Sequence, residues 1–152
     1  MKSTQEEKAL AERLRASRFS GEGFLGTDSR SLDEIVAEDR RALERLGLAR
    51  KQLLAVLRDT FEQARAALGA EIEPLPGVTA VAHEAMGRIP SPFRGDGVFE
   101  KGDVEVTDRA TGAKLVITRL GLALIEKHGF FQGRGSRYRL DPQQVAEVFK
   151  LD

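Results

Sequence analysis

The chain contains no cysteine, which excludes disulfide bonds, thiolate nucleophiles and cysteine-ligated zinc or iron–sulfur centres. It has only two histidines, His83 and His128, and neither belongs to an H-x-x-x-H arrangement, so we predict no metal site and no cofactor. The longest apolar runs span a few residues, far below the roughly 20 that cross a bilayer. The segment 2–8 also lacks the apolar core of a signal peptide. We therefore expect a cytoplasmic protein that makes no membrane contact.

The chain also lacks net charge, with 24 Lys and Arg against 24 Asp and Glu, which argues against strong non-specific DNA binding. The charge is unevenly distributed, because residues 21–48 carry a net charge of −3 and residues 114–152 a net charge of +3. Two interpretations follow. Either the acidic middle docks on the basic end within the molecule, or the basic end presents a face to a partner.

The length of 152 residues gives room for one domain with its own core, and we predict a single domain over 1–152. Its helical part covers about 1–69 and its β-rich part about 70–152. Arginine outnumbers lysine and alanine is abundant, which is typical of proteins from GC-rich bacterial genomes.

Helical signals fill the first half. Good helix formers over residues 4–18 predict a peripheral first helix. Ser31, followed three residues later by Glu34, forms a capping box that begins a second helix, and Gly47 ends it. A third helix is expected over 49–68. Because the connection around Gly47 is so short, we predict that the second and third helices form an antiparallel hairpin.

The pattern changes near residue 70, where prolines and glycines become frequent. We expect a strand over 78–82, then a β-hairpin formed by 104–107 and 114–118, with Gly112 at the end of its loop. A short helix is expected up to His128, and a last helix after Asp141 and Pro142. The fold class is therefore α+β: an N-terminal helical hairpin, plus a peripheral first helix, packed on a small antiparallel sheet with one or two C-terminal helices.

The string Gly21-Glu22-Gly23-Phe24-Leu25-Gly26 matches the G-x-G-x-x-G pattern of dinucleotide-binding proteins. In those proteins the glycines join a strand to a helix. Here the preceding segment is helical and the next helix starts only near residue 31, so we interpret the string as a loop between helices.

The most unusual stretch is 127–139, which places cations and aromatic rings between glycines. We expect residues 133–140 to form a short hairpin after the preceding helix, which is the layout of a DNA-binding wing. The candidate ligand- or nucleic-acid-binding residues are Lys127, His128, Arg134, Arg137, Tyr138 and Arg139. In the alternative interpretation, the arginines pair with the acidic helix over 31–46.

Catalytic signals are weak. The chain has no G-x-S-x-G motif and no evident nucleophile–base set, so we assign no catalytic residue. Glu84 and Glu100 lie in irregular backbone where pockets form. If either meets His128 in one cleft, a small hydrolase or isomerase with His128 as general base becomes an alternative.

Taken together, these patterns favour a non-enzymatic binding or regulatory module that acts through protein contacts. We expect a protein partner or self-association, and the amphipathic helices make a dimer one form of it. Nucleic-acid or phosphate-ligand binding through 127–139 is the alternative function.

Overall fold

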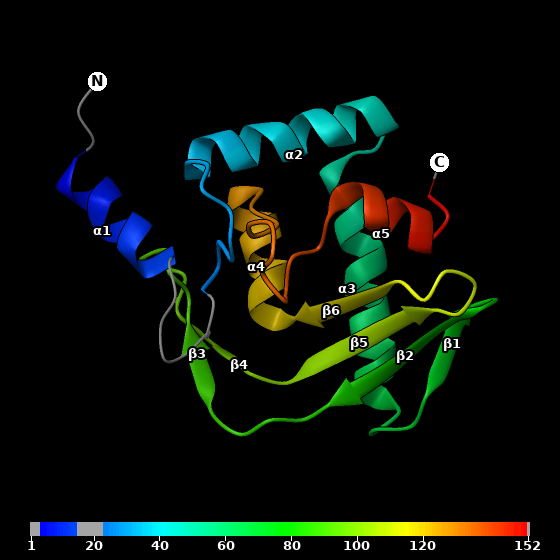
Figure 1. The fold of residues 1–152 in the computed structure, drawn as a ribbon. Coiled ribbons are helices and arrows are strands. Elements are labelled where there is room, and N and C mark those ends of the chain that lie inside the picture. The colour runs from blue at the N-terminus through cyan, green and yellow to red at the C-terminus, as the bar shows by residue number, and fades with distance from the viewer. Residues whose placement is uncertain (1–3, 15–22, 152) are drawn as a thin grey trace.

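The computed structural model describes residues 4–14 and 23–151, and this part of the chain has an α+β fold (Figure 1). Its helices are α1 (Gln5–Leu14), α2 (Leu32–Leu46), α3 (Arg50–Ala66), α4 (Arg119–His128) and α5 (Pro142–Val148). Its strands are β1 (Ile72–Leu75), β2 (Val78–His83), β3 (Arg88–Pro90), β4 (Val98–Glu100), β5 (Asp103–Asp108) and β6 (Lys114–Thr118). None of the described helices combines the length and apolar character needed to cross a bilayer.

The main sheet is antiparallel with the strand order β1-β2-β5-β6, and β3 and β4 pair separately. The predicted strand near 78–82 is β2, and the predicted hairpin is β5–β6, which turns through Gly112 at a φ of 76°. The sequence did not predict β1, β3 or β4. Each is only three or four residues long, and β1 and β3 contain prolines that weaken a strand pattern.

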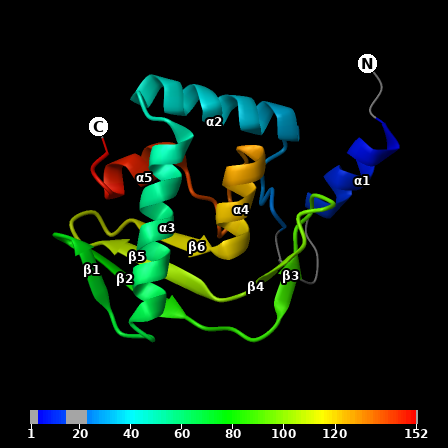
Figure 2. The same ribbon diagram turned by 180° about the vertical axis from the view of Figure 1, so that it is seen from behind.

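Helix α3 covers one face of the main sheet, as the view from behind shows (Figure 2). Because side chains alternate along a strand, one face of β2, β5 and β6 is apolar and packs on Leu57 and Phe61 of α3. The fully buried strand residues of this core are Val78, Ala80, Val104, Val106, Leu115 and Ile117. The other face carries half-buried residues such as Val81, Glu105 and Thr107 and is not covered by a described helix.

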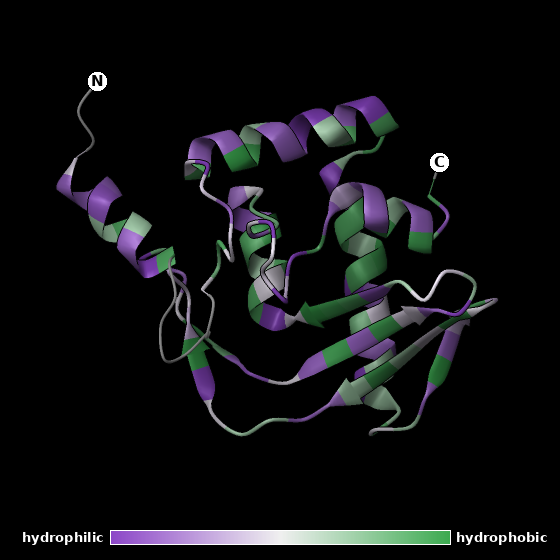
Figure 3. Ribbon diagram, viewed as in Figure 1, coloured by the Kyte–Doolittle hydropathy of each residue, from purple (hydrophilic) through white to green (hydrophobic). Residues whose placement is uncertain are grey.

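A second apolar cluster lies between α1, α2 and α4. Its buried members are Leu14, Phe24, Leu25, Ile35, Leu120, Leu124 and Phe130. The β3–β4 hairpin packs against it through Ile89, Phe93 and Phe99, which are partly buried. Figure 3 shows α4 and much of α3 as hydrophobic, whereas α2 is mainly hydrophilic. The second cluster therefore holds α2 and the hairpin against α4.

The predicted helix boundaries are confirmed where local signals set them. Ser31 accepts a hydrogen bond from the Glu34 amide at 3.2 Å, and Gly47 has a φ of 68°. Asp141 likewise accepts from the Gln144 amide at 3.1 Å. The first helix ends at Leu14 within the described residues, and the remainder of its predicted range, 15–18, lies outside them.

One part of the helical prediction is wrong. Helices α2 and α3 are consecutive and joined by residues 47–49, but they do not lie along each other as a hairpin. In Figures 1 and 2, α2 lies across the top of the fold and α3 runs from its C-terminal end onto the sheet. A short link fixes only that two helix ends are adjacent, whereas side-chain packing fixes the crossing angle. Here α2 packs on α5 and on the second cluster instead.

The predicted hairpin over 133–140 is also absent, because these residues form turns and no strand. Residues 132–136 instead run against residues 23–28. The Gly133 amide donates to the Phe24 carbonyl at 2.8 Å, and the Thr27 amide donates to the Arg134 carbonyl at 2.9 Å. A Cβ on Gly133 would overlap the Leu25 carbonyl, so glycine is required by this close backbone approach. Gly26 of the string 21–26 also serves packing, because a Cβ there would overlap the backbone of Gly135 and Ser136, while Gly21 and Glu22 lie outside the described residues.

Candidate functional site

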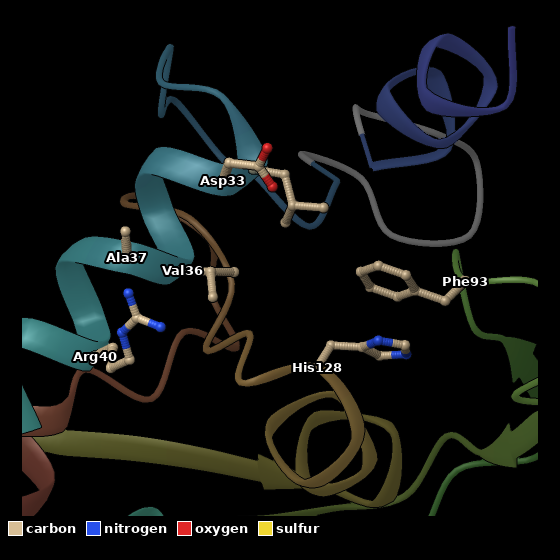
Figure 4. A pocket seen from close by; sticks show the side chains of 7 residues that line it. Asp33, Val36, Ala37, Arg40, Phe93 and His128 are labelled. Atoms are coloured by element: carbon tan, nitrogen blue, oxygen red, sulfur yellow. The ribbon is translucent and has the colours of Figure 1, made fainter. Parts of the chain in front are cut away.

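The candidate site is a groove along α2, which we call the α2 groove. It consists of two adjoining hollows of about 260 and 540 Å³ that share Val36, Arg40 and His128. Figure 4 shows the first, with α2 side chains on one side and the rings of Phe93 and His128 on the other. The second continues past Gly129 to the start of α3. Its walls come from elements far apart in the sequence.

The wall opposite α2 is built around His128, the last residue of α4. Its ring stacks on Phe93 with 3.7 Å between centroids and 15° between planes. Its Nε2 lies 2.8 Å from a carboxylate oxygen of Asp96, which also accepts a hydrogen bond from the Ser91 hydroxyl at 3.0 Å. Because Ser91, Phe93 and Asp96 all lie between β3 and β4, these contacts fix that connection to the end of α4.

The charge state of Asp96 follows from its surroundings. Burial alone would raise the pKa of this carboxyl, but the hydrogen bonds from His128 and Ser91 outweigh it and the pKa is lowered. Asp96 is therefore an anion at neutral pH. A carboxylate that holds an imidazole is found both in general-base sites and in structural anchors. Since Ser91 donates to Asp96 and not to His128, the described cluster contains no serine activated by the imidazole.

Cations collect toward the α3 end of the groove. Arg40, Arg50 and Lys51 line it, and none of them forms an ion pair with a described residue. The Arg50 guanidinium lies against Gly129, where an added Cβ would come within 2.6 Å of its Nη1. The negative end of the α4 dipole lies there and favours a cation. For Arg40 and Lys51, no helix C-terminus or ion-pair partner of this kind is found within the described part of the chain.

The predicted site residues separate in the structure. His128 lines the α2 groove, and its neighbour Lys127 is exposed. Arg139 is not a surface residue: its side chain is 11% exposed and forms a two-pronged ion pair with Asp39 at 2.8 and 2.9 Å. It also donates to Asp141 and to the Gln132 carbonyl. For Arg139, the alternative of pairing with the acidic helix is therefore confirmed.

The other predicted residues stay at the surface, away from the groove lining. Arg134 and Arg137 are exposed and Tyr138 is half-buried. The guanidinium carbon of Arg137 lies 5.4 Å from the centroid of the Tyr138 ring, which is a cation–π distance. Arg134, Arg137 and Tyr138 therefore lie at the surface, whereas Arg139 does not.

The three residues of the enzyme alternative do not share a described pocket. Glu84 and Glu100 line one hollow together with Arg65, whereas His128 lines the α2 groove. The hydrogen bond from Arg65 lowers the pKa of Glu100, so the negative charge of this carboxylate is balanced by the Arg65 guanidinium. The carboxylate at His128 is Asp96 instead. The structure gives no support to a mechanism in which His128 works with Glu84 or Glu100.

Sequence reasoning missed Phe93 and Arg40 as groove residues and Asp96 as the partner of His128. The rigid segment 89–93 was a signal for the first, because alternate prolines hold the chain extended and present Phe93 at a defined place. No local pattern indicates that Asp96 meets a histidine 32 residues away.

Among the described residues, no three histidine or acidic side chains gather as metal ligands would. Comparison with known proteins finds no family model, no curated protein and no solved structure that matches this chain.

Proposed function

We propose that this protein is a binding module whose α2 groove takes an acidic, partly apolar segment of a protein partner. The observation that carries this proposal is the groove itself. It has apolar side chains along its length and, at the α3 end, cations without acidic partners among the described residues. Such a surface is complementary to a segment that combines carboxylates with one or two large apolar side chains.

The groove also favours one position for the partner's carboxylate. Asp33 lines the hollow beside Phe93, and Glu44 lines the second hollow together with Arg50 and Lys51, so each repels an acid in its own vicinity. Arg50 and Lys51 are the first two residues of α3, where the Ala49 amide donates to the Gln52 side chain at 2.8 Å but the N-cap residue has no side chain to accept from the amides that follow. A partner carboxylate is therefore expected at this helix start, and its apolar side chain between Val36 and Phe93.

Fluorescence anisotropy with labelled peptides tests the proposal. One peptide alternates Glu with Leu and Phe, and a second replaces every Glu with Gln. Arg40→Glu should weaken binding of the acidic peptide at least about tenfold, and added salt should weaken it further. Arg45→Glu is the matched control, because Arg45 lies on the same helix, is exposed and does not line the groove.

Equal binding of the two peptides, or no binding at about 1 mM, would contradict the proposal. Light scattering should be used to measure the oligomeric state alongside the titration, because self-association is the other protein contact that the sequence favours. A dimer that Arg40→Glu dissociates would assign the groove to a second copy of the chain.

Nucleic-acid binding is a second candidate function, favoured by the exposed pair Arg134 and Arg137 beside the Tyr138 ring. Phosphate contacts would make such binding steeply salt-dependent, and Tyr138 would supply a stacking surface. The titration is repeated with single-stranded and duplex oligonucleotides at low and moderate salt. This candidate fails if neither binds at low salt, or if the combined Arg134→Ala and Arg137→Ala variant binds unchanged.

A further inference from the structure

A second cavity lies apart from the α2 groove, and we call it the inner cavity. It has a volume of about 190 Å³ and lies between the segment after Gly23, the β3–β4 hairpin, the start of α4 and the loop 130–140. Phe24, Ile89 and Leu120 form apolar walls, and Tyr138 adds an aromatic ring. None of these side chains lines the α2 groove.

Gln132 is the unusual member of this cavity. It is a polar side chain with only 4% of its surface exposed, and it lines the cavity. Its Oε1 accepts a hydrogen bond from the Ser136 hydroxyl at 2.9 Å, which fixes the orientation of the amide. Its Nε2 has no acceptor among the described residues. Because no fully buried side-chain nitrogen or oxygen among the described residues lacks a partner, this Nε2 is accessible to solvent and is open as a donor to a ligand in the cavity that Gln132 lines.

The backbone of Gln132 supports the same conclusion. Its φ is 72°, a left-handed conformation that favours glycine, in a loop that otherwise uses glycine freely. Such strain is retained where a particular side chain is needed at that point. The Gln132 carbonyl also accepts from Arg139, whose side chain is largely buried, at 2.7 Å, which helps to hold the residue in place.

The remaining polar groups of the inner cavity define the ligand further. Asp103 presents a carboxylate, of which one oxygen lies 3.1 Å from His83 Nδ1. Glu100 is engaged by Arg65, so Asp103 is the acceptor with spare capacity. Lys101 lines the cavity and is exposed, and Arg137 packs on the Tyr138 ring at its border. The site thus offers one amide donor, one carboxylate acceptor, an aromatic face and two outer cations.

We propose that the inner cavity binds the base of a mononucleotide. A ring carbonyl accepts from Gln132, a ring N–H or amino group donates to Asp103, and the base lies against Tyr138. The cavity is smaller than the roughly 300–1,000 Å³ of sites for larger ligands, so it holds one ring system. The phosphate stays outside, near Lys101 and Arg137. This proposal is independent of the peptide function of the α2 groove.

Two-dimensional amide NMR of the full chain tests it, with uridine and guanosine 5′-monophosphates, whose bases carry a ring carbonyl and a ring N–H, as probes at about 5 mM. At least one nucleotide should shift the resonances of Gln132, Tyr138 and Thr118, while ribose 5-phosphate should not. Gln132→Met should weaken binding at least about tenfold, because the donor is lost while the size is kept. Ala85→Trp serves as a second variant, since Ala85 is exposed at the cavity and a large ring there blocks entry without disturbing the core.

Arg40→Glu in the α2 groove is the matched control and should leave nucleotide binding unchanged. The proposal is overturned if no nucleotide shifts these resonances, or if ribose 5-phosphate shifts them equally. It is also overturned if the Ala85→Trp variant, whose NMR spectrum shows that it is folded, binds the nucleotide as tightly as the unaltered protein does.

Discussion

The substitution Arg139→Met tests whether this arginine is a structural residue. Arg139 donates four hydrogen bonds of 2.7–2.9 Å, two of them to Asp39, whose side chain is only 4% exposed. Methionine keeps the apolar stem but leaves the Asp39 carboxylate buried without its counter-charge. Breaking a buried ion pair in this way costs about 3–5 kcal/mol, a large share of the roughly 5–15 kcal/mol that stabilises a typical domain. For a chain of this size, the midpoint of thermal unfolding should fall by about 6–20 °C.

Urea unfolding followed by circular dichroism measures this loss, and Asp39→Leu completes a double-mutant cycle. With both charges removed, the free energy of unfolding of the double variant should be at least about 2 kcal/mol higher than the sum of the two single losses predicts. A single-variant loss below about 1 kcal/mol, or simple additivity in the cycle, would refute the assignment.

Three further predictions concern stability. Gly26→Ala should lower the free energy of unfolding by about 3 kcal/mol or more, because its φ is 59° and the new Cβ would overlap the Ser136 amide. Gly112→Ala, at a φ of 76° in open space, should lower it by only about 1–2 kcal/mol. Equal losses of the two variants in urea unfolding would contradict this. Ser31→Ala should lower the free energy of unfolding by about 1 kcal/mol, because the N-cap hydrogen bond is lost. A change near zero would mean that solvent replaces this hydrogen bond. Asp96→Asn should cost about 1–2 kcal/mol at pH 7. Folding lowers the pKa of Asp96, so the charged carboxylate stabilises the fold fully above the unfolded pKa near 3.9. This stabilisation is lost as the pH falls through the folded pKa. The difference in free energy of unfolding between the unaltered protein and Asp96→Asn should therefore disappear in acid. A gap that is constant with pH would show that the charge of Asp96 is not involved.

The parts of the fold that the sequence predicted depend on neighbours within one helical turn. The Ser31 cap and its partner are three residues apart, and Gly47 needs only its own φ. The strand alternation of β5 and β6 is equally local. These patterns could be read because propensity, capping and burial all point the same way.

The candidate sites depend on contacts between distant residues, and for that reason the sequence could not specify them. Arg139, Arg134 and Arg137 look alike in the loop, but within residues 4–14 and 23–151 only the Arg139 side chain forms an ion pair, with an aspartate 100 residues earlier. His128 is one of the candidate residues that the sequence suggested, while its contact with Asp96 follows from how the β3–β4 hairpin packs on α4. The crossing of α2 and α3 is similarly decided by the side chains that each helix buries.

The backbone contact between residues 23–28 and 132–136 has a kinetic consequence. It includes the Arg134 amide and Asp28, which are 106 residues apart, so forming it closes a loop of most of the chain. Loop closure over that length costs about 4 kcal/mol of chain entropy, which only the completed packing of the second cluster repays. This junction is therefore expected to form after the sheet and α3, and to open first. Amide hydrogens of Thr27 and Gly133 should then exchange with solvent through partial opening, well before those of β5. The inner cavity is lined by Gly23, Phe24 and Gln132 of this junction, so opening of the junction is expected to open that cavity as well.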